Sequence, residues 1–292
     1  MTAELIVDAR NGVGESPVWV AGEQALYWVD IPSGCLQRWR LDGALDSWQG
    51  DEMLGCVAPL ANGSWLAARE SGLFRLRADE HGRLLGESVA EVSHARTGMR
   101  FNDGRCDRQG RFWAGTMQMN MGSEAVGKLY RYTTRDGLVP QLDGLLVPNG
   151  LAFSPDGKTM YLSDSHASVQ LIWAFDYDTD SGTAHNRRVF VDMNAHPGRP
   201  DGAAVDAEGC YWTCANDAGL VLRFTPEGKL DRSLPLPVKK PAMCAFGGPG
   251  LDTLFVTSIR PQGVDLGDQP LAGGLFALNV GVKGLEEPSF NG

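Results

Sequence analysis

The sequence predicts an all-β protein, and within that class a six-bladed β-propeller that occupies residues 1–292 as one domain. Short β-rich runs alternate with turn residues, 37 glycines among them, and no stretch has the period of an amphipathic helix. A phrase consisting of a turn, an aromatic residue and a short apolar run recurs about every 38 to 50 residues. Three or four strands per repeat are typical of propeller blades, which bury both faces against their neighbours.

Each copy of the phrase predicts the centre of one blade, because an apolar strand precedes it and a further strand follows most copies. The copies lie at residues 25–28, 63–65, 110–113, 157–161, 209–212 and 251–255. The strand-like run 4–9 precedes the first copy, so we expect it to pair with the last blade and close the ring. A β-sandwich would not require a repeat of this length. We interpret the following aromatic residues as packing between blades rather than as a sugar platform: Trp19, Trp28, Trp113 and Trp212.

Composition excludes several classes of partner. The chain has 26 lysines and arginines against 36 acidic residues, and the formal net charge of −10 repels nucleic acid and anionic lipid. The sequence shows neither a secretion signal nor an apolar run of bilayer length. We interpret the six cysteines as free, buried thiols in a reducing cytoplasm. We therefore expect a cytoplasmic monomer or weak homo-oligomer that binds a small molecule and neither nucleic acid nor a membrane.

Candidate site residues follow from the repeat, because equivalent positions in different blades converge on the propeller axis. Counting back about ten to twelve residues from each aromatic leads, in four repeats, to side chains with oxygen donors. They are Glu15, Asn102, Asn149 and Asp201. In the other repeats the count falls near Cys56 and Met243. Oxygen donors with two negative charges suit one divalent cation such as Ca²⁺, Mg²⁺ or Mn²⁺, while Zn²⁺ and Fe²⁺ remain possible although no histidine converges there.

Each of these residues also has an ordinary interpretation. Asn149 and Asp201 stand in Pro-Asn-Gly and Pro-Asp-Gly, which are common turn sequences, but turn chemistry does not require their common phase in the repeat. Arg100 is either a solvated arginine beside an Asn-Asp-Gly turn or forms, with Asn102, a pair that binds substrate. We assign Asp103 to the turn itself. No nucleophile elbow, phosphate loop or dinucleotide fingerprint occurs in the sequence.

The motifs GESPVW, RFNDGRCDRQGRFWAGTM, PNGLAFSPDGKTMYLSDS and PDGAAVDAEGCYW follow one another in this order. Over nearly its whole length the chain resembles the senescence-marker-protein/gluconolactonase/regucalcin family of six-bladed propellers, which includes luciferin-regenerating proteins. The resemblance implies that Glu15, Asn149 and Asp201 bind one divalent metal ion. It also implies that Arg100 and Asn102 contact the substrate and that Asp201 is the general base.

One departure from the family pattern affects the substrate. Some animal members have an acidic residue a few positions after AGTM, whereas this chain has Asn120, which we expect to offer an amide to the substrate. The expected activity is hydrolysis of a gluconolactone-like sugar lactone to the aldonic acid, as in carbohydrate metabolism. The metal would polarise the carbonyl and Asp201 would accept a proton from water. The alternatives are a hydrolase for phosphotriesters or non-sugar lactones, and a non-catalytic calcium-binding regulatory protein.

Overall fold

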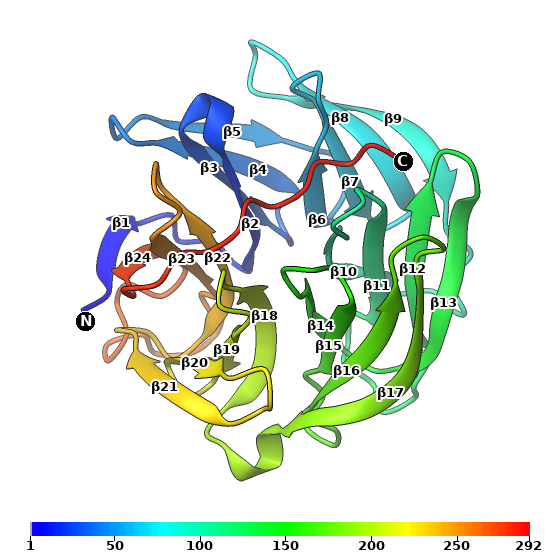
Figure 1. The fold of residues 1–292 in the computed structure, drawn as a ribbon. Coiled ribbons are helices and arrows are strands. Elements are labelled where there is room, and N and C mark those ends of the chain that lie inside the picture. The colour runs from blue at the N-terminus through cyan, green and yellow to red at the C-terminus, as the bar shows by residue number, and fades with distance from the viewer. Residues whose placement is uncertain (1) are drawn as a thin grey trace.

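A ring of six antiparallel sheets surrounds a central axis in the computed structural model, which describes residues 2–292 (Figure 1). Each sheet has four strands, which confirms the predicted six-bladed propeller. The first strand of each blade contacts its counterparts in the neighbouring blades around the axis. These first strands are β2 (Gly14–Val20), β6 (Leu54–Pro59), β10 (Met99–Cys106), β14 (Pro148–Phe153), β18 (Arg199–Val205) and β22 (Pro241–Gly247).

The remaining strands follow outward from the axis in chain order. Blades one and two contain β3 (Ala25–Asp30), β4 (Cys35–Arg40), β5 (Leu45–Gln49), β7 (Trp65–Arg69), β8 (Gly72–Ala78) and β9 (Leu84–Glu91). Blades three and four contain β11 (Phe112–Gln118), β12 (Gly127–Thr133), β13 (Gly137–Leu145), β15 (Thr159–Asp164), β16 (Leu171–Asp178) and β17 (Thr183–Asp192). Blades five and six contain β19 (Tyr211–Asn216), β20 (Leu220–Phe224), β21 (Leu230–Pro235), β23 (Thr253–Ser258) and β24 (Leu275–Asn279).

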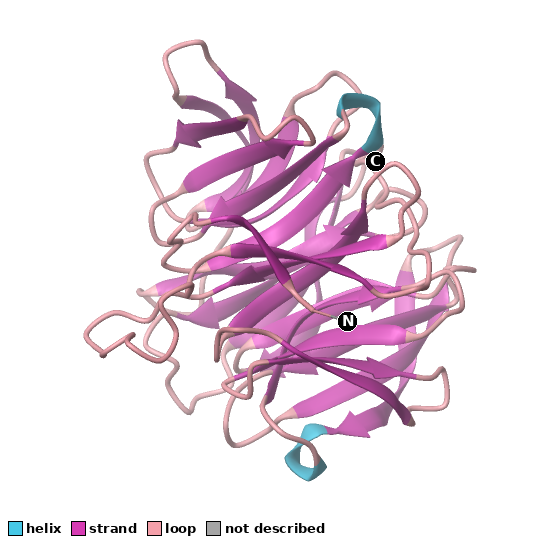
Figure 2. Ribbon diagram, turned by 90° about the vertical axis from the view of Figure 1, so that its left-hand side faces the viewer, coloured by secondary structure: helices cyan, strands magenta, loops and turns pink. Residues whose placement is uncertain are grey.

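Blade six is completed by the N-terminal strand β1 (Glu4–Val7), which pairs antiparallel with β24. The sequence prediction of this closure is confirmed, although the strand ends at Val7 rather than at residue 9. Within residues 2–292, helical structure is limited to two single turns, η1 (Ala21–Glu23) and η2 (Met193–Ala195), which Figure 2 shows in cyan. Neither of them is long and apolar enough to cross a membrane.

The hydrophobic core is divided among the interfaces between neighbouring blades, each of which has its own buried apolar cluster. Trp19 and Trp28 pack between blades six and one, Trp113 between blades three and four, and Trp212 between blades five and six. All four indoles are buried, so the prediction that they pack the blades is confirmed. Truncating one such side chain to alanine would cost about 3–5 kcal/mol of stability.

The six cysteines are buried and none forms a disulfide, as the sequence predicted. Burial raises the pKa of the thiols of Cys56, Cys106 and Cys214 well above the usual value for cysteine. Because the thiolate is the reactive form, these side chains behave as small apolar residues of the core.

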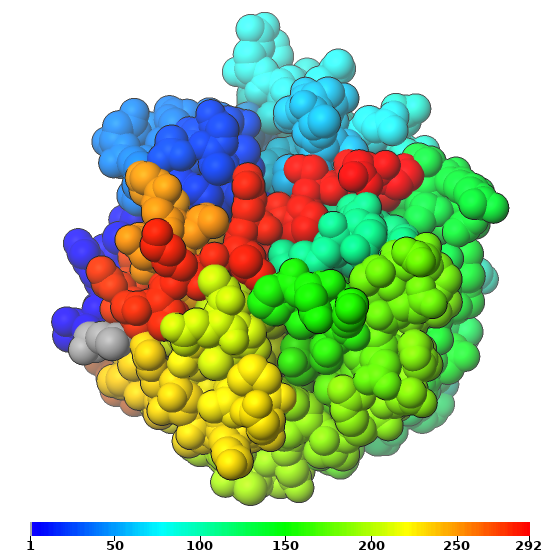
Figure 3. All heavy atoms as spheres, viewed as in Figure 1, coloured from blue at the N-terminus to red at the C-terminus, as the bar shows by residue number. Residues whose placement is uncertain are grey.

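Residues 280–292, the C-terminal strap, run across one end of the propeller axis, where Figures 1 and 3 show them in red over the centre of the ring. Its backbone bonds to loops that join first and second strands of different blades. Gly284 N–H donates to Leu251 O at 2.7 Å, and Asn291 N–H donates to Gly110 O at 3.1 Å. The strap therefore ties together blades that are distant in the sequence.

A buried ion pair links the strap to the axis. Arg105 of β10 donates from Nη1 to Glu287 Oε1 of the strap at 2.9 Å, and from Nη2 to Ala203 O of β18 at 2.5 Å. The side chains of Arg105 and Glu287 are only 9% and 16% exposed. The candidate site residues lie nearer the opposite ends of the first strands, so the strap closes the channel on the side away from them.

Candidate metal and substrate site

A distortion at the same place in each first strand positions the candidate residues. The pairing register between the first and second strands shifts across residues 15–18, 101–104, 149–152 and 200–203 in blades one, three, four and five. Such a bulge bends the strand and re-aims its side chains. Glu15, Asn102, Asn149 and Asp201 lie at these bulges, and all are buried.

These positions correct one expectation from the sequence. Asn149 and Asp201 stand in sequences typical of turns, but they lie within β14 and β18, and Glu15 and Asn102 lie within β2 and β10. Asp103, which was assigned to a turn, is also a buried strand residue, and its Oδ2 accepts a hydrogen bond from Leu151 N–H at 2.9 Å. Gly150, in the Asn-Gly pair, has φ of 59°, which favours glycine. Gly202, in the Asp-Gly pair after Asp201, is required for close packing instead, because a Cβ there would lie 2.3 Å from Met243 Cγ.

Two carboxylates face the axis without a cationic partner. Glu15 and Asp201 are 6% and 7% exposed, and within residues 2–292 neither forms an ion pair. Burial raises the pKa of Glu15 well above its usual value, and the negative charges of Asp201 and Asp103 raise it further. Burial likewise raises the pKa of Asp201 to about 7, against the lowering effect of the hydrogen bond from Asn216 Nδ2 to Asp201 Oδ2 at 2.6 Å.

Buried carboxylates in proteins are normally paired with a cation or coordinate a metal ion. A divalent cation between Glu15 and Asp201 would offset both the burial and the mutual repulsion. Glu15 and Asp201 thus have the buried negative charge that the metal site predicted from the sequence requires.

The two asparagines are connected by a hydrogen-bond network that fixes their orientation. Asn102 Nδ2 donates to Asn149 Oδ1 at 2.9 Å and to Pro148 O at 3.0 Å, and Asn149 Nδ2 donates to Ser165 Oγ at 2.7 Å. With its nitrogen engaged by Ser165, Asn149 keeps a second lone pair on Oδ1, which can coordinate a cation. Asn102 Oδ1 accepts from Arg100 Nη1 at 2.7 Å.

Arg100 is held on the blade-three side of the axis by this bond and by a second one, from Nη1 to Phe101 O at 2.8 Å. Burial lowers the pKa of Arg100 to about 10, partly offset by the negative charges of Glu15 and Asp201. The guanidinium therefore stays charged at neutral pH. Its remaining N–H groups have no hydrogen-bond partner within residues 2–292, so they can donate to a ligand.

These residues surround a cavity of about 310 Å³ at the end of the channel away from the strap. Met117, Met119, Met121 and Val147 give it an apolar wall, and Arg199 and Lys240 stand on its other side. Asn216 and Ser165 also line it, and neither was predicted from the sequence. Their positions in the repeat could have identified them. Asn216 is the last residue of the second strand β19, and Ser165 directly follows the second strand β15, so both lie beside a bulge of a first strand.

Asn120, expected to contact substrate, lies in the turn after β11 and is exposed. Its Oδ1 accepts from Gly122 N–H at 3.2 Å, and its neighbours Met119 and Met121 line the cavity instead. A role for Asn120 in substrate binding stays a prediction that depends on how this turn meets a ligand.

The donor atoms fit a divalent cation. Glu15, Asn149 and Asp201 offer only oxygen, and no histidine or cysteine of residues 2–292 lines the cavity. Hard cations such as Ca²⁺ and Mg²⁺ prefer such ligands.

A second acidic cluster has a structural explanation. Ligand atoms of Asp206, Glu208 and Cys210 lie within 4.8 Å of one another. However, Arg223 already donates from Nε to Asp206 Oδ2 at 2.8 Å and from Nη2 to Glu208 Oε2 at 2.5 Å. The guanidinium occupies the place of a cation, and Asp206 Oδ1 also accepts from Cys210 N–H to fix the turn between β18 and β19.

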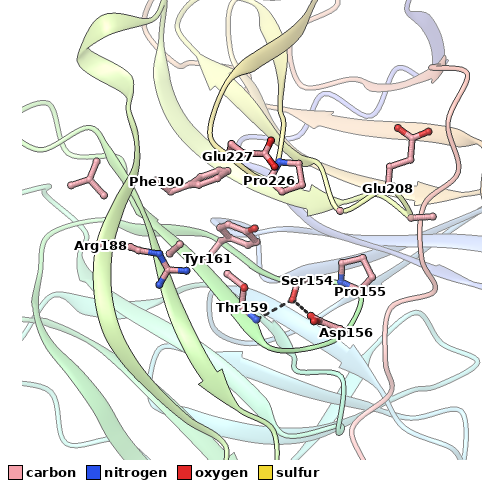
Figure 4. Close-up of a pocket in the computed structure, with 14 residues that line it drawn as sticks. Ser154, Pro155, Asp156, Thr159, Tyr161, Arg188, Phe190, Glu208, Pro226 and Glu227 are labelled. Atoms are coloured by element: carbon pink, nitrogen blue, oxygen red, sulfur yellow. Dashed lines mark hydrogen bonds between the residues drawn. The ribbon is translucent and has the colours of Figure 1, made fainter.

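A larger hollow of about 590 Å³ lies between blades four and five, as Figure 4 shows. Tyr161 and Phe190 form its floor, while Asp156, Arg188 and Glu227 stand around it. These charged side chains are exposed, and Arg188 is paired with Asp176 outside the hollow at 2.8 Å. Exposed charges in water have weak electrostatic effects, so the axial cavity is the better candidate for chemistry.

A comparison with protein-family models matches residues 13–260 to the SMP-30/gluconolactonase/LRE-like region. The chain belongs to this family. A relative within it, 6-deoxy-6-sulfogluconolactonase of Pseudomonas putida, is 41% identical over 100% of this chain and 99% of its own. Regucalcin of Danio rerio is 35% identical over 99% of this chain and 98% of its own. The crystal structure of a calcium-binding protein, regucalcin, from Agrobacterium tumefaciens has a TM-score of 0.91, 28% identity and coverage of 98% and 96%.

The family assignment confirms the resemblance seen in the sequence, and the structural relative shares the propeller fold. The match begins at residue 13, just before Glu15, and ends at residue 260, so it spans all the residues that line the axial cavity except Pro261. The axial site is thus part of the family region rather than an addition to it.

Proposed function

We propose that this protein hydrolyses a sugar lactone to its aldonic acid, with one divalent cation bound by Glu15, Asn149 and Asp201. The observation that carries the proposal is the pair of buried carboxylates, Glu15 and Asp201, that face one cavity without an ion-pair partner within residues 2–292. The name of one relative, a sulfogluconolactonase, agrees with lactone hydrolysis, whereas the name regucalcin fits the alternative of a calcium-binding regulatory protein.

The nucleophile is water rather than a side chain. Ser165 is the serine of the cavity, and its Oγ contacts Pro200 O and accepts from Asn149 Nδ2. No histidine of residues 2–292 lines the cavity to activate it. When bound, a divalent cation supplies Lewis-acid polarisation of the lactone carbonyl.

Asp201 is the general base. Its Oδ2 is fixed by Asn216, so the carboxylate is held in one orientation toward the cavity. It accepts a proton from the attacking water as the new C–O bond forms at the carbonyl carbon. The bond from that carbon to the ring oxygen then breaks, and the proton passes to the departing oxygen, which gives the hydroxy acid.

Arg100 and Asn102 hold the sugar. The free N–H groups of Arg100 donate to hydroxyl or ring oxygens, and the remaining lone pair of Asn102 Oδ1 accepts from a hydroxyl. Met117 and Val147 exclude water from the opposite face of the ring. Asn120 offers a further amide if its turn closes over the cavity.

A substrate panel tests this function. Acid release would be measured for glucono-1,5-lactone, a pentonolactone, γ-butyrolactone and a phosphotriester, each corrected for spontaneous hydrolysis. The protein would carry one equivalent of Ca²⁺, Mg²⁺, Mn²⁺, Zn²⁺ or Fe²⁺. We expect the sugar lactones to be hydrolysed fastest. Faster hydrolysis of the phosphotriester or the non-sugar lactone would contradict the proposal, and tight calcium binding without turnover would favour a regulatory protein.

A further inference from the structure

The mouth of the axial cavity carries cations at one repeated position. Arg199 directly precedes Pro200 in β18, and Lys240 directly precedes Pro241 in β22, and the register shifts from each proline onward. Arg199 and Lys240 therefore hold equivalent positions in blades five and six. Arg100, just before the bulge at Phe101, holds the same position in blade three.

The side chains of Arg199 and Lys240 form a layer outside the carboxylates, whereas the side chain of Arg100 reaches down to Asn102. The side chains of Arg199 and Lys240 are 26% and 27% exposed. Asp201 is 7% exposed, so it lies deeper. The same layer in blades one and four consists of Val13 and Val147, and the acidic residues that line the cavity are the deeper Glu15 and Asp201. With Asp217 between Arg199 and Lys240, this outer layer has one net positive charge, although the whole chain has a net charge of −10.

The local charge governs a bound ligand more than the net charge does. Interactions between exposed charges are largely screened beyond about 8 Å at physiological ionic strength. A ligand in the mouth of the cavity therefore experiences chiefly Arg199, Lys240 and the groups below them. A cation bound at the carboxylates would make this region more positive still.

Arg199 and Lys240 already share one oxyanion. Arg199 Nε donates to Asp217 Oδ2 at 2.7 Å, and Lys240 Nζ contacts Asp217 Oδ1. One carboxylate between two cations leaves one positive charge without a partner. Lys240 has three N–H donors, and within residues 2–292 only Asp217 accepts from it. The pair can therefore bind a second oxyanion that enters from the cavity.

We propose that the preferred substrate is a lactone that bears an anionic group, and that Lys240 and Arg199 bind this group. A sulfonate, a carboxylate and a phosphate share the required chemistry. The lactone carbonyl would lie at the carboxylate layer, near Arg100, and the charged end of the sugar would lie on the side of blades five and six. This inference rests on the proposed lactonase function and names the substrate class within it.

The test compares kcat/KM for matched lactones of one aldonic acid series. Glucono-1,5-lactone is the neutral member, and its 6-sulfo, 6-carboxylate (glucarolactone) and 6-phospho counterparts are the anionic members. We expect at least one anionic lactone to exceed the neutral one by about tenfold or more, the scale of a hydrogen bond to a charged group. The preferred member identifies the anion, and raising the salt concentration should reduce the preference.

Single substitutions test which residues produce the preference for anionic lactones. Lys240→Met should lower the ratio of anionic to neutral kcat/KM about tenfold, because it removes one charged donor. Lys239→Met is the matched control, since Lys239 is adjacent in sequence but pairs with Asp268 outside the axial cavity, and it should leave the ratio unchanged. Asp217→Asn should raise the ratio, because it removes the competing carboxylate.

Separate outcomes distinguish this inference from the proposed function. Hydrolysis of neutral lactones with no preference for any anionic member would overturn the inference and leave the lactonase function intact. A preference that persists in Lys240→Met, with unchanged thermal unfolding, would overturn the role of Lys240. If no lactone of either kind is hydrolysed, the proposed function itself fails.

Discussion

The two buried carboxylates should make the metal-free protein less stable than it would be without them. Asp201→Asn removes one charge and keeps the side-chain volume and an oxygen that can accept from Asn216. We therefore expect the metal-free variant to be more stable than the metal-free wild type at neutral pH. The variant also removes the repulsion between Asp201 and Glu15, because the charge of Asp201 raises the pKa of Glu15.

The magnitude follows from the pKa of Asp201, which rises from 3.8 in an unfolded chain to about 7 in the fold. Below pH 3.8 both states hold the proton, so the carboxyl has no effect on stability. Between pH 3.8 and 7 the unfolded state loses the proton first, and stability falls by about 1.4 kcal/mol per pH unit. At pH 7 and above the cost reaches about 4 kcal/mol, which the variant avoids.

Urea unfolding of chelator-treated proteins at pH 4, 5.5 and 7 measures this difference. The gap between Asp201→Asn and wild type should be near zero at pH 4 and should grow toward pH 7. Asp217→Asn is a matched control that should lower the free energy of unfolding at pH 7 instead of raising it. Arg199 and Lys240 stabilise the ionised form of Asp217, and its pKa is lowered despite partial burial. A gap that is absent at pH 7, or that does not change with pH, would show that the buried charge of Asp201 does not destabilise the fold.

Two further predictions concern catalysis and the strap. Asp201→Asn should lower kcat for lactone hydrolysis about 10²-fold or more even at saturating metal, because the amide cannot accept the proton; wild-type rates in excess metal would show that Asp201 is only a ligand. Glu287→Gln should lower the free energy of unfolding by about 3 kcal/mol, because Arg105 then lies buried without its charged partner; unfolding in urea measures this, and a change within about 0.5 kcal/mol would contradict it.

Much of the fold was predictable because each blade repeats the same local pattern. The aromatic phrases mark the second strands, and their spacing predicts the number of blades and the common phase of Glu15 and Asp201. The position of these residues within strands was not predictable, because a bulge and a turn use the same glycine-containing pairs. Asp103 was assigned to a turn for that reason.

Other features depend on contacts that form only when the ring closes. Asn216 and Ser165 become site residues because second strands end beside the bulges of the first strands. The equivalence of Arg199 and Lys240 is visible only once the bulges align blades five and six. The strap has no repeat pattern at all, and its place is set by loops of separate blades that meet at the axis.

The proposed metal-dependent hydrolysis is tested most directly by removing the cation and adding it back. The protein would be stripped with a chelator, its metal content measured by elemental analysis, and its activity followed as Ca²⁺, Mg²⁺, Mn²⁺, Zn²⁺ or Fe²⁺ is added. We expect no activity above the spontaneous rate without metal, and recovery that is complete at one equivalent per chain. Full lactonase activity in protein shown to contain no metal would contradict it.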